Sequence, residues 1–328
     1  MAYNWSEIMI SGLDRRTSCV IFVYYILISV LIILSNVMVV IAFIKTPKLR
    51  TLTNTFILNL AASDILVGVH LICCAYLEYW VSYSYHSDHW DCLFCGFTVT
   101  LSFGVSLFTL MAISAERFIK IIYPMHYFMY VTKNRIIVTM VSIWVFFLAV
   151  GSAILYWNRW YHGIRCMILD IQPRAGFYGM ILPLVVSPIG IILILYAKIF
   201  HVARKQRKAI EKQSYLNQGE LENVKKEGSK TFMMFLLIGW ITVAWTPFML
   251  TALARIITED VTGDLMVFQK IGWIFTMEHI FHGLVYTNSF VNPVIYGWKS
   301  LEWRNAFKSV LCMSSQNKVD PWSQSDSK

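Results

Sequence analysis

The chain has 328 residues, of which 57% are hydrophobic and only 14% are charged. Soluble domains carry about a quarter charged residues, so this composition excludes an ordinary soluble domain and favours a polytopic membrane protein. The formal net charge of +9 does not by itself identify a partner, and we expect no nucleic-acid binding.

The apolar residues gather in long blocks. A helix needs about 20 apolar residues to cross about 30 Å of hydrocarbon, and seven blocks meet this requirement. We therefore expect an all-α fold, a seven-transmembrane helix bundle with a short amphipathic eighth helix. The predicted spans are residues 20–44, 54–78, 93–122, 136–157, 177–200, 231–256 and 271–297.

The same pattern divides the chain into four parts. No cleavable signal peptide is evident, so the first span would act as the targeting signal. The parts are a short N-terminal segment (1–19), the seven-span domain (20–298), an amphipathic helix (299–312) and a tail (313–328).

Lysine and arginine favour the cytoplasmic loops of membrane proteins. With the N-terminus outside, 21 of the 28 Lys and Arg residues fall on the cytoplasmic side and seven on the other. We therefore expect an extracellular N-terminus and a cytoplasmic tail. Asn4 begins a glycosylation sequon, Asn4-Trp5-Ser6, that would face outside, although such sequons also arise by chance.

Asp64 lies in the middle of the second predicted span, which contains no Lys or Arg. Ionisable residues inside a membrane are functional candidates. Two interpretations remain open: a neutral carboxylic acid hydrogen-bonded between helices, or a cation site, because small hard cations bind several oxygen atoms. Other spans offer further oxygens in Ser106, Asn288, Ser289 and Asn292.

Each predicted span carries a short motif. In chain order these are LSN with Asn36, LAASD with Asp64, SAERF with Arg117, Trp144, Pro188 followed by Tyr196, AWTPF with Trp245, and NPVIY with Pro293. Together, one per span and in this order, they resemble the rhodopsin-like (class A) G-protein-coupled receptors over nearly the whole chain. The resemblance implies a plasma-membrane receptor, not an enzyme, that binds an extracellular ligand and activates a heterotrimeric G protein. It also implies regulation by a receptor kinase and arrestin, and contact with membrane lipid.

Several positions depart from the family pattern. Phe118 replaces the usual tyrosine after Arg117, and Ala244 replaces the usual cysteine before Trp245. Ile241 stands one turn below Trp245, where the family usually has a phenylalanine. The chain therefore lacks the side chain on which the family's usual packing switch depends.

The resemblance also assigns roles to the polar residues. Asp64, Ser106, Trp245, Asn288, Ser289 and Asn292 map onto the family's sodium pocket. Sodium would then be an allosteric modulator bound at Asp64, and no other cofactor is expected. The alternative is a polar cavity that holds only water.

A second set of residues maps onto the family's cytoplasmic switch. Arg117 follows Cys92 by 25 residues, or about 37 Å of helix, so the two lie at opposite faces of the membrane. We expect Glu116 and Glu227 to hold Arg117 in the resting state, although Glu227 could equally be a solvated charge. On activation the sixth span would swing outward at Pro247. The residues expected to line the G-protein cavity or let it form are Arg117, Tyr196, Pro293 and Tyr296.

The cysteines lack the spacing of a zinc site. Cys92 and Cys166 resemble the family's bridge from the third span to the second extracellular loop, with Cys95, one turn deeper, as the alternative. Cys312 ends the amphipathic helix and is a candidate for palmitoylation or a spare thiol.

The ligand is poorly determined. Amine receptors carry aspartate where Val99 stands, opsins carry lysine where Tyr286 stands, and adenosine receptors carry asparagine where Ala252 stands. A small molecule or short peptide is favoured because the N-terminal segment is short. The expected ligand residues are Val99, Thr100, Phe103, Met180, Trp245, Phe248, Met249, Ala252, Glu278, His279, His282 and Tyr286.

Three of these, Glu278, His282 and Tyr286, recur every four residues and so share one helix face. They form either a polar wall of the ligand site or only part of an aqueous vestibule. A constitutively active receptor that needs no ligand is the main alternative. A transporter is the alternative from another class, but the sequence shows no internal repeat.

Overall fold

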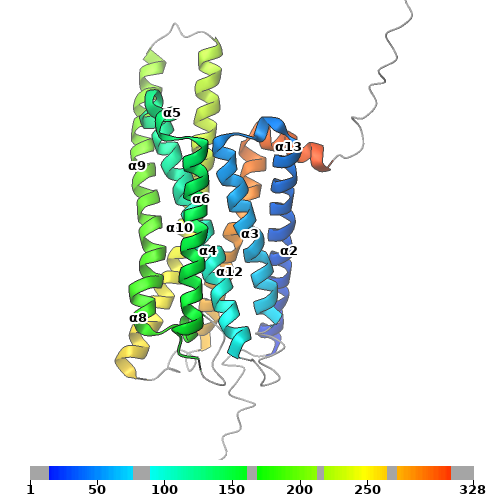
Figure 1. Cartoon of the computed structure of the whole chain (residues 1–328), viewed down its shortest axis with the longest axis vertical. Coiled ribbons are helices and arrows are strands. Elements are labelled where there is room, and N and C mark those ends of the chain that lie inside the picture. The colour runs from blue at the N-terminus through cyan, green and yellow to red at the C-terminus, as the bar shows by residue number, and fades with distance from the viewer. Residues whose placement is uncertain (1–14, 77–88, 161–167, 213–217, 264–271, 312–328) are drawn as a thin grey trace, which may run out of the picture.

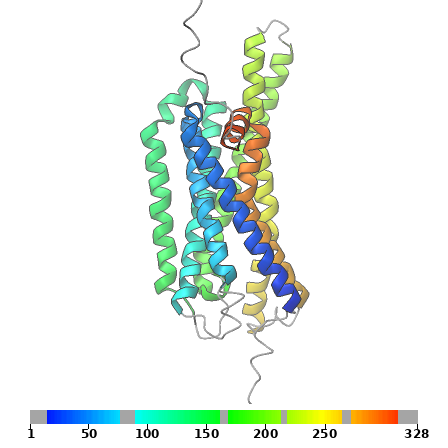
Figure 2. The ribbon, with the colours of Figure 1, turned by 90° about the vertical axis from the view of Figure 1, so that its right-hand side faces the viewer.

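The computed structural model describes residues 15–76, 89–160, 168–212, 218–263 and 272–311, and all regular structure in them is helical. Long helices run side by side in one bundle (Figures 1 and 2). This arrangement confirms the all-α, seven-helix fold. The long helices are α2 (Arg15–Lys45), α3 (Leu52–Tyr76), α4 (His89–Ile122), α6 (Lys133–Tyr156), α9 (Leu182–Lys212), α10 (Gln218–Thr262) and α12 (Gly272–Lys299).

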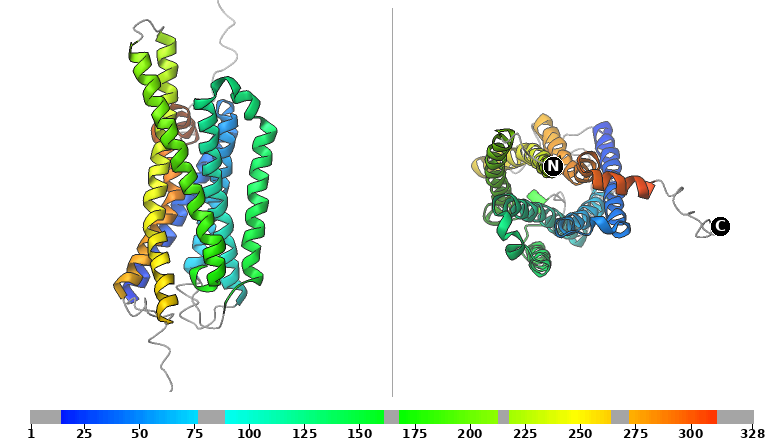
Figure 3. Two further views of the ribbon diagram at one scale, coloured as in Figure 1. Left: turned by 90° about the vertical axis from the view of Figure 1, so that its left-hand side faces the viewer. Right: turned by 90° about the horizontal axis from the view of Figure 1, so that it is seen from above.

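Six helical segments of the described residues are long and apolar enough to cross a membrane. They comprise α2, α3, α4, α6, α10, and the continuous stretch that ends in α9. The seventh helix, α12, carries more polar residues and packs against α2, α3 and α10. Seen from above, the helices are arranged around a common axis (Figure 3).

Short elements connect the long ones. Pro47 and Pro124 begin the 3₁₀ helices η1 (Pro47–Leu49) and η4 (Pro124–His126), because proline has no amide hydrogen to leave unsatisfied at a helix start. A single turn, α5 (Tyr127–Tyr130), follows η4. The remaining elements are α7 (Ile168–Ile171), α8 (Arg174–Gly176), the π-helical turn η5 (Phe177–Ile181) and α13 (Leu301–Leu311).

Three helices are longer than predicted. α2 begins at Arg15, inside the segment assigned to the N-terminus. α9 continues to Lys212 and α10 begins at Gln218, whereas the predicted spans cover only 177–200 and 231–256. Hydropathy identifies the part of a helix that crosses lipid, and these helices continue as polar segments beyond it.

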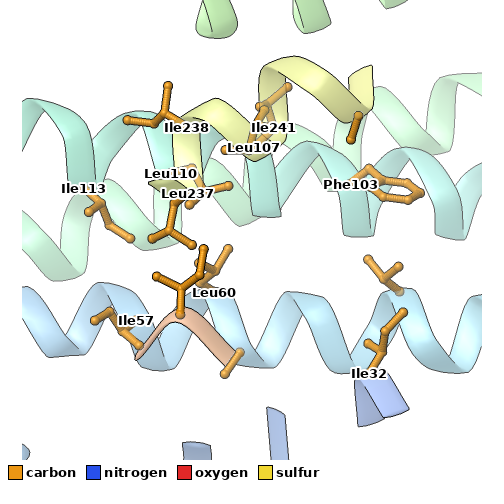
Figure 4. Close-up of a cluster of buried hydrophobic side chains, with 14 of the residues drawn as sticks. Ile32, Ile57, Leu60, Phe103, Leu107, Leu110, Ile113, Leu237, Ile238 and Ile241 are labelled. Atoms are coloured by element: carbon orange, nitrogen blue, oxygen red, sulfur yellow. The ribbon is translucent and has the colours of Figure 1, made fainter. Parts of the chain in front are cut away.

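The core between the helices is aliphatic between Asp64 and Arg117. Side chains from α3, α4 and α10 converge there, and Ile241 is one of them (Figure 4). This layer lies between Asp64 and Arg117 along α3 and α4. We call these residues the aliphatic layer: Ile57, Leu60, Leu107, Leu110, Ile113, Leu237, Ile238 and Ile241.

A glycine sets the approach of α4 to α6. A Cβ atom on Gly104 would lie 2.1 Å from Cδ1 of the buried Phe147 ring. Any larger residue would push the two helices apart, so the close α4–α6 contact requires glycine here.

Candidate functional site

The carboxylate of Asp64 is fully buried at the centre of a polar cluster. The Ser106 hydroxyl donates to Oδ1 at 3.0 Å, and the Ser289 hydroxyl donates to the same oxygen at 2.8 Å. The Asn292 amide donates to Oδ2 at 2.8 Å. The structure therefore brings together residues of α3, α4 and α12, as the sequence predicted.

Two further asparagines, Asn36 and Asn288, are also buried. Asn36 of α2 donates to the backbone carbonyls of Ser289 and Ile32, each at 3.0 Å, so α2 is tied to α12 beside Asp64. Asn288 is buried, and its Oδ1 accepts no hydrogen bond within the described residues; the same holds for Oδ1 of Asn292. Buried oxygens normally have a partner, so these two carbonyl oxygens are available to a bound cation or water.

At the end of the bundle where Arg117 lies, Glu116 is held by three neighbours. Its Oε1 accepts hydrogen bonds from the Thr53 hydroxyl at 2.8 Å and the Tyr127 hydroxyl at 2.6 Å. Its Oε2 lies 3.5 Å from Nε of Arg117. Burial and the bond to Glu116 raise the pKa of the Tyr127 hydroxyl, so the phenol stays protonated and donates. The loop of α5 is thus fastened to α3 and α4 through one carboxylate.

The expected second partner of Arg117 is the side chain of Glu227, which lies outside the described residues. Arg117, Thr53 and Tyr127 line a cavity of about 470 Å³ at this end of the bundle. The Tyr296 ring is buried close by and stacks obliquely on Trp303 of α13, with 5.9 Å between centroids.

A second cavity, of about 80 Å³, lies between α4, α9, α10 and α12, towards the end of the bundle opposite Arg117. We call it the outer cavity. Seven predicted ligand residues line it: Val99, Thr100, Phe103, Trp245, Phe248, Met249 and His282. The other five, Met180, Ala252, Glu278, His279 and Tyr286, are not among its lining residues.

Tyr286 lies behind the outer cavity. Its ring contacts Phe103 at 5.2 Å and His282 at 4.9 Å between centroids, and its hydroxyl lies 3.5 Å from Nε2 of His70. Nδ1 of His70 is 2.8 Å from the Thr98 hydroxyl. Tyr286 therefore packs against residues of α3 and α4 behind the lining of the outer cavity.

Glu278 belongs instead to an ionic cluster at the ends of the helices opposite Arg117. The Arg255 side chain is only 2% exposed and donates to Glu278 and to Glu259, each at 2.8 Å, and also to Asp170. Arg174 pairs with Glu259 and with Asp260. The guanidinium of Arg255 thus ties α10 both to the neighbouring α12 and to α7, whose Asp170 is 85 residues away in the sequence.

The loop helix α7 is held over the outer cavity by this cluster. Ile168 and Leu169 line the cavity, and the next residue, Asp170, is bonded to Arg255. Nε of Arg159 donates to the Asp170 carbonyl at 2.6 Å, and its Nη2 donates to the Leu169 carbonyl at 3.2 Å. Burial lowers the pKa of the Arg159 guanidinium, but an arginine remains charged at neutral pH.

Along the bundle, the outer cavity is followed by the buried carboxylate of Asp64, then by the aliphatic layer, and then by Arg117. The family model described as "7 transmembrane receptor (rhodopsin family)" matches residues 35–296 of the chain. The chain belongs to this family. It is therefore a receptor, and the class A resemblance drawn from its motifs is confirmed, as is the expectation that it is not an enzyme.

Curated relatives of this rhodopsin-family receptor include adenosine receptors. The human adenosine receptor A2a is 28% identical over 300 residues, covering 87% of this chain and 70% of the relative. The rat adenosine receptor A2b is 24% identical over 308 residues, covering 87% of each chain. The family and the apolar helices also establish a multi-pass protein of the plasma membrane.

Several predicted modifications concern residues that are not described. Cys92 is buried and takes part in a disulfide, as predicted, which favours it over Cys95. Its predicted partner Cys166, the sequon residue Asn4 and the palmitoylation candidate Cys312 all lie outside the described residues.

Sequence reasoning missed some residues of the receptor. The Trp144 indole donates to Oδ1 of Asn59 at 2.9 Å, and Nδ2 of Asn59 donates to the Thr109 hydroxyl at 2.8 Å, so α6, α3 and α4 are linked. A polar Asn59 in an apolar span was a usable signal. Thr53 and Tyr127 gave none, because loop tyrosines and threonines are common.

We expect Tyr127→Phe and Thr53→Val each to raise basal signalling. Either change removes one donor from Glu116, costing about 1 kcal/mol, which corresponds to about a fivefold shift in a two-state equilibrium. Second-messenger levels in transfected cells, normalised to surface expression, measure the effect. Tyr130→Phe is the control, because Tyr130 lies in the same turn and is exposed. Unchanged basal levels in both test variants would argue against a restraining role for these bonds.

Proposed function

We propose that this receptor binds a small extracellular ligand in the outer cavity and activates a heterotrimeric G protein through an outward movement of α10. One observation carries the proposal. Trp245 lines the outer cavity and contacts Phe103 edge-to-face at 5.5 Å, and the same helix carries Ile241 into the aliphatic layer. A shift of the Trp245 ring would therefore be transmitted along α10 to the cytoplasmic cavity.

Pro247 supports the proposed movement. It lies inside α10, two residues beyond Trp245, where proline removes one backbone hydrogen bond and weakens the helix. Pro293 is the corresponding break in α12, three residues before Tyr296. An outward tilt at Pro247 would let Arg117, Tyr196 and Tyr296 reach a G protein.

The remaining partners and the orientation belong to the same proposal. The N-terminus would be extracellular, which places the cavity beside Arg117 in the cytoplasm. A receptor kinase and arrestin would act on the cytoplasmic side, and membrane lipid would surround the bundle. Exposed apolar residues such as Leu34, Val138 and Leu250 on different helices suit contact with lipid.

We also propose that sodium binds at Asp64 as an allosteric modulator. The residues present fit such an ion: one buried carboxylate, two serine hydroxyls, and the carbonyl oxygens of Asn288 and Asn292. Hard cations prefer such oxygen donors. The carboxylate and these oxygens would hold the ion, and the ion would supply a positive charge that neutralises Asp64.

Second-messenger assays in transfected cells, with and without a library of small ligands, test the proposed function. Arg117→Ala is expected to reduce the ligand response at least about tenfold, because the arginine would meet the G protein directly. Arg135→Ala is the control, since Arg135 is exposed on α6. A well-expressed receptor that shows neither basal nor ligand-dependent signalling would contradict the proposal. High basal signalling without any ligand response would favour the constitutively active alternative.

A further inference from the structure

The lining of the outer cavity is apolar and uncharged. Among its described lining residues there is no Asp, Glu, Lys or Arg. Aliphatic side chains make up most of the lining, and Phe103, Phe147, Trp245 and Phe248 add aromatic rings. A charged ligand group placed here would lose its hydration without gaining a counter-charge, which is strongly unfavourable.

The carboxylates of the ionic cluster already have cationic partners. Asp170, Glu259 and Glu278 all pair with Arg255, and Asp260 pairs with Arg174. Removing one partner of a buried ion pair is costly. A ligand ammonium or carboxylate would have to break this cluster before it could recruit one of its members.

One polar group of the lining remains to be satisfied. The Trp245 side chain is buried, and its Nε1–H donates to no acceptor within the described residues. The Thr100 hydroxyl already donates to the Gly96 carbonyl at 2.9 Å. The His282 ring stacks on Phe248 at 5.2 Å between centroids and presents a ring edge with nitrogen atoms. The Trp245 indole N–H is therefore a hydrogen-bond donor to which a ligand could offer an acceptor.

We propose that the outer cavity binds a compact, neutral and mostly apolar molecule with one hydrogen-bond acceptor, which takes the indole N–H of Trp245. This inference rests on the proposed function only for the location of the ligand site. Pockets for drug-sized ligands usually measure about 300–1,000 Å³. The outer cavity, at about 80 Å³, is far smaller, so it favours a compact molecule over a peptide. It also selects against a nucleoside such as adenosine, whose many polar groups would find few partners.

A matched series of probes tests the ligand class: 4-ethylbenzamide, 4-ethylbenzoic acid, 4-ethylbenzylamine and adenosine. Binding to the full-length receptor in phosphatidylcholine nanodiscs is measured by saturation-transfer NMR at pH 7.4, with empty nanodiscs subtracted. The neutral amide is expected to bind at least about tenfold more tightly than its anionic and cationic analogues, because their charge would be buried without a partner. Equal or tighter binding of the acid, the amine or adenosine would overturn the proposal, as would no binding of the amide.

Two variants locate the binding. Trp245→Phe keeps an aromatic ring but removes the donor, and is expected to weaken amide binding about fivefold. Val99→Asp places a carboxylate in the lining and is expected to reverse the preference from the amide to the amine. Unchanged amide affinity in the first variant, or an unchanged order of probes in a folded Val99→Asp receptor, would contradict the assignment.

G-protein nucleotide exchange measured with the same probes separates this inference from the proposed function. Selective amide binding without nucleotide exchange would support the ligand class and count against the amide acting as an activating ligand. Exchange stimulated by adenosine or by either charged analogue would support the proposed function and overturn the ligand class.

Discussion

Replacement of Arg255 by methionine is expected to lower the free energy of unfolding by about 3–5 kcal/mol, the largest effect of any single change considered for this receptor. Methionine has a similar length but no charge. Its introduction leaves Glu259, Glu278 and Asp170 buried together without the guanidinium that all three contact. Their mutual repulsion and lost hydration would separate α7, α10 and α12. Thermal unfolding of the purified receptor, followed by circular dichroism at one fixed scan rate, measures the loss.

Arg174→Met is the matched control. The Arg174 side chain is 22% exposed, and its partner Asp260 is 40% exposed, so water screens their interaction. Its other partner, the buried Glu259, keeps its ion pair with Arg255 when Arg174 is replaced. Partly exposed pairs contribute about 1 kcal/mol or less. Equal losses in the two variants would mean that Arg255 has no special structural role. Arg255→Lys provides a second comparison, because lysine keeps the charge but cannot contact three carboxylates in the same fixed geometry.

Asp64→Ala is expected to abolish the effect of sodium on the receptor entirely. A ligand that binds only the folded state stabilises it by RT ln(1 + [L]/Kd), which is about 1.4 kcal/mol at ten times Kd. The wild-type midpoint of thermal unfolding should therefore rise with sodium chloride relative to choline chloride at equal ionic strength. The variant, which lacks the only carboxylate in the described Asp64 cluster, should show no difference between the two salts.

Asp64→Asn serves as the control for packing. Asparagine has nearly the volume of aspartate and keeps hydrogen-bonding capacity, but it supplies no negative charge to a cation. It should lose the sodium effect while unfolding closer to the wild-type temperature than Asp64→Ala does. A sodium effect of the same size in wild type and both variants would rule out the site at Asp64.

The sequence was sufficient for the helices, whereas the grouping of residues around Asp64 was expected only from the family resemblance. Long apolar blocks report directly on membrane crossing, and Asp64, Ser289 and Asn292 are conspicuous because polar groups are costly in such blocks. The ionic cluster was not predictable in the same way. Arg255 and Asp170 are 85 residues apart, and each lies near a predicted helix end, where charged residues are ordinary.

The predicted ligand wall shows a second limit. Glu278, His282 and Tyr286 do share one helix face, but only His282 reaches the outer cavity. Glu278 lies one turn before His282 along α12 and meets Arg255. Tyr286 lies one turn after His282 and meets His70 and Phe103. Periodicity gives the face of a helix, whereas the depth at which that face meets a ligand or a neighbour depends on the other helices.

The length of α10 determines how far its free end would move in the proposed tilt. From Pro247 to Gln218 the helix covers 29 residues, or about 44 Å at 1.5 Å per residue. If Pro247 acts as the pivot, a tilt of about ten degrees displaces the far end by about 8 Å, while Trp245, two residues from the pivot, moves by about half an ångström. Under the proposed tilt, a displacement smaller than a bond length beside the ligand would therefore become one of about 8 Å at the far end of α10.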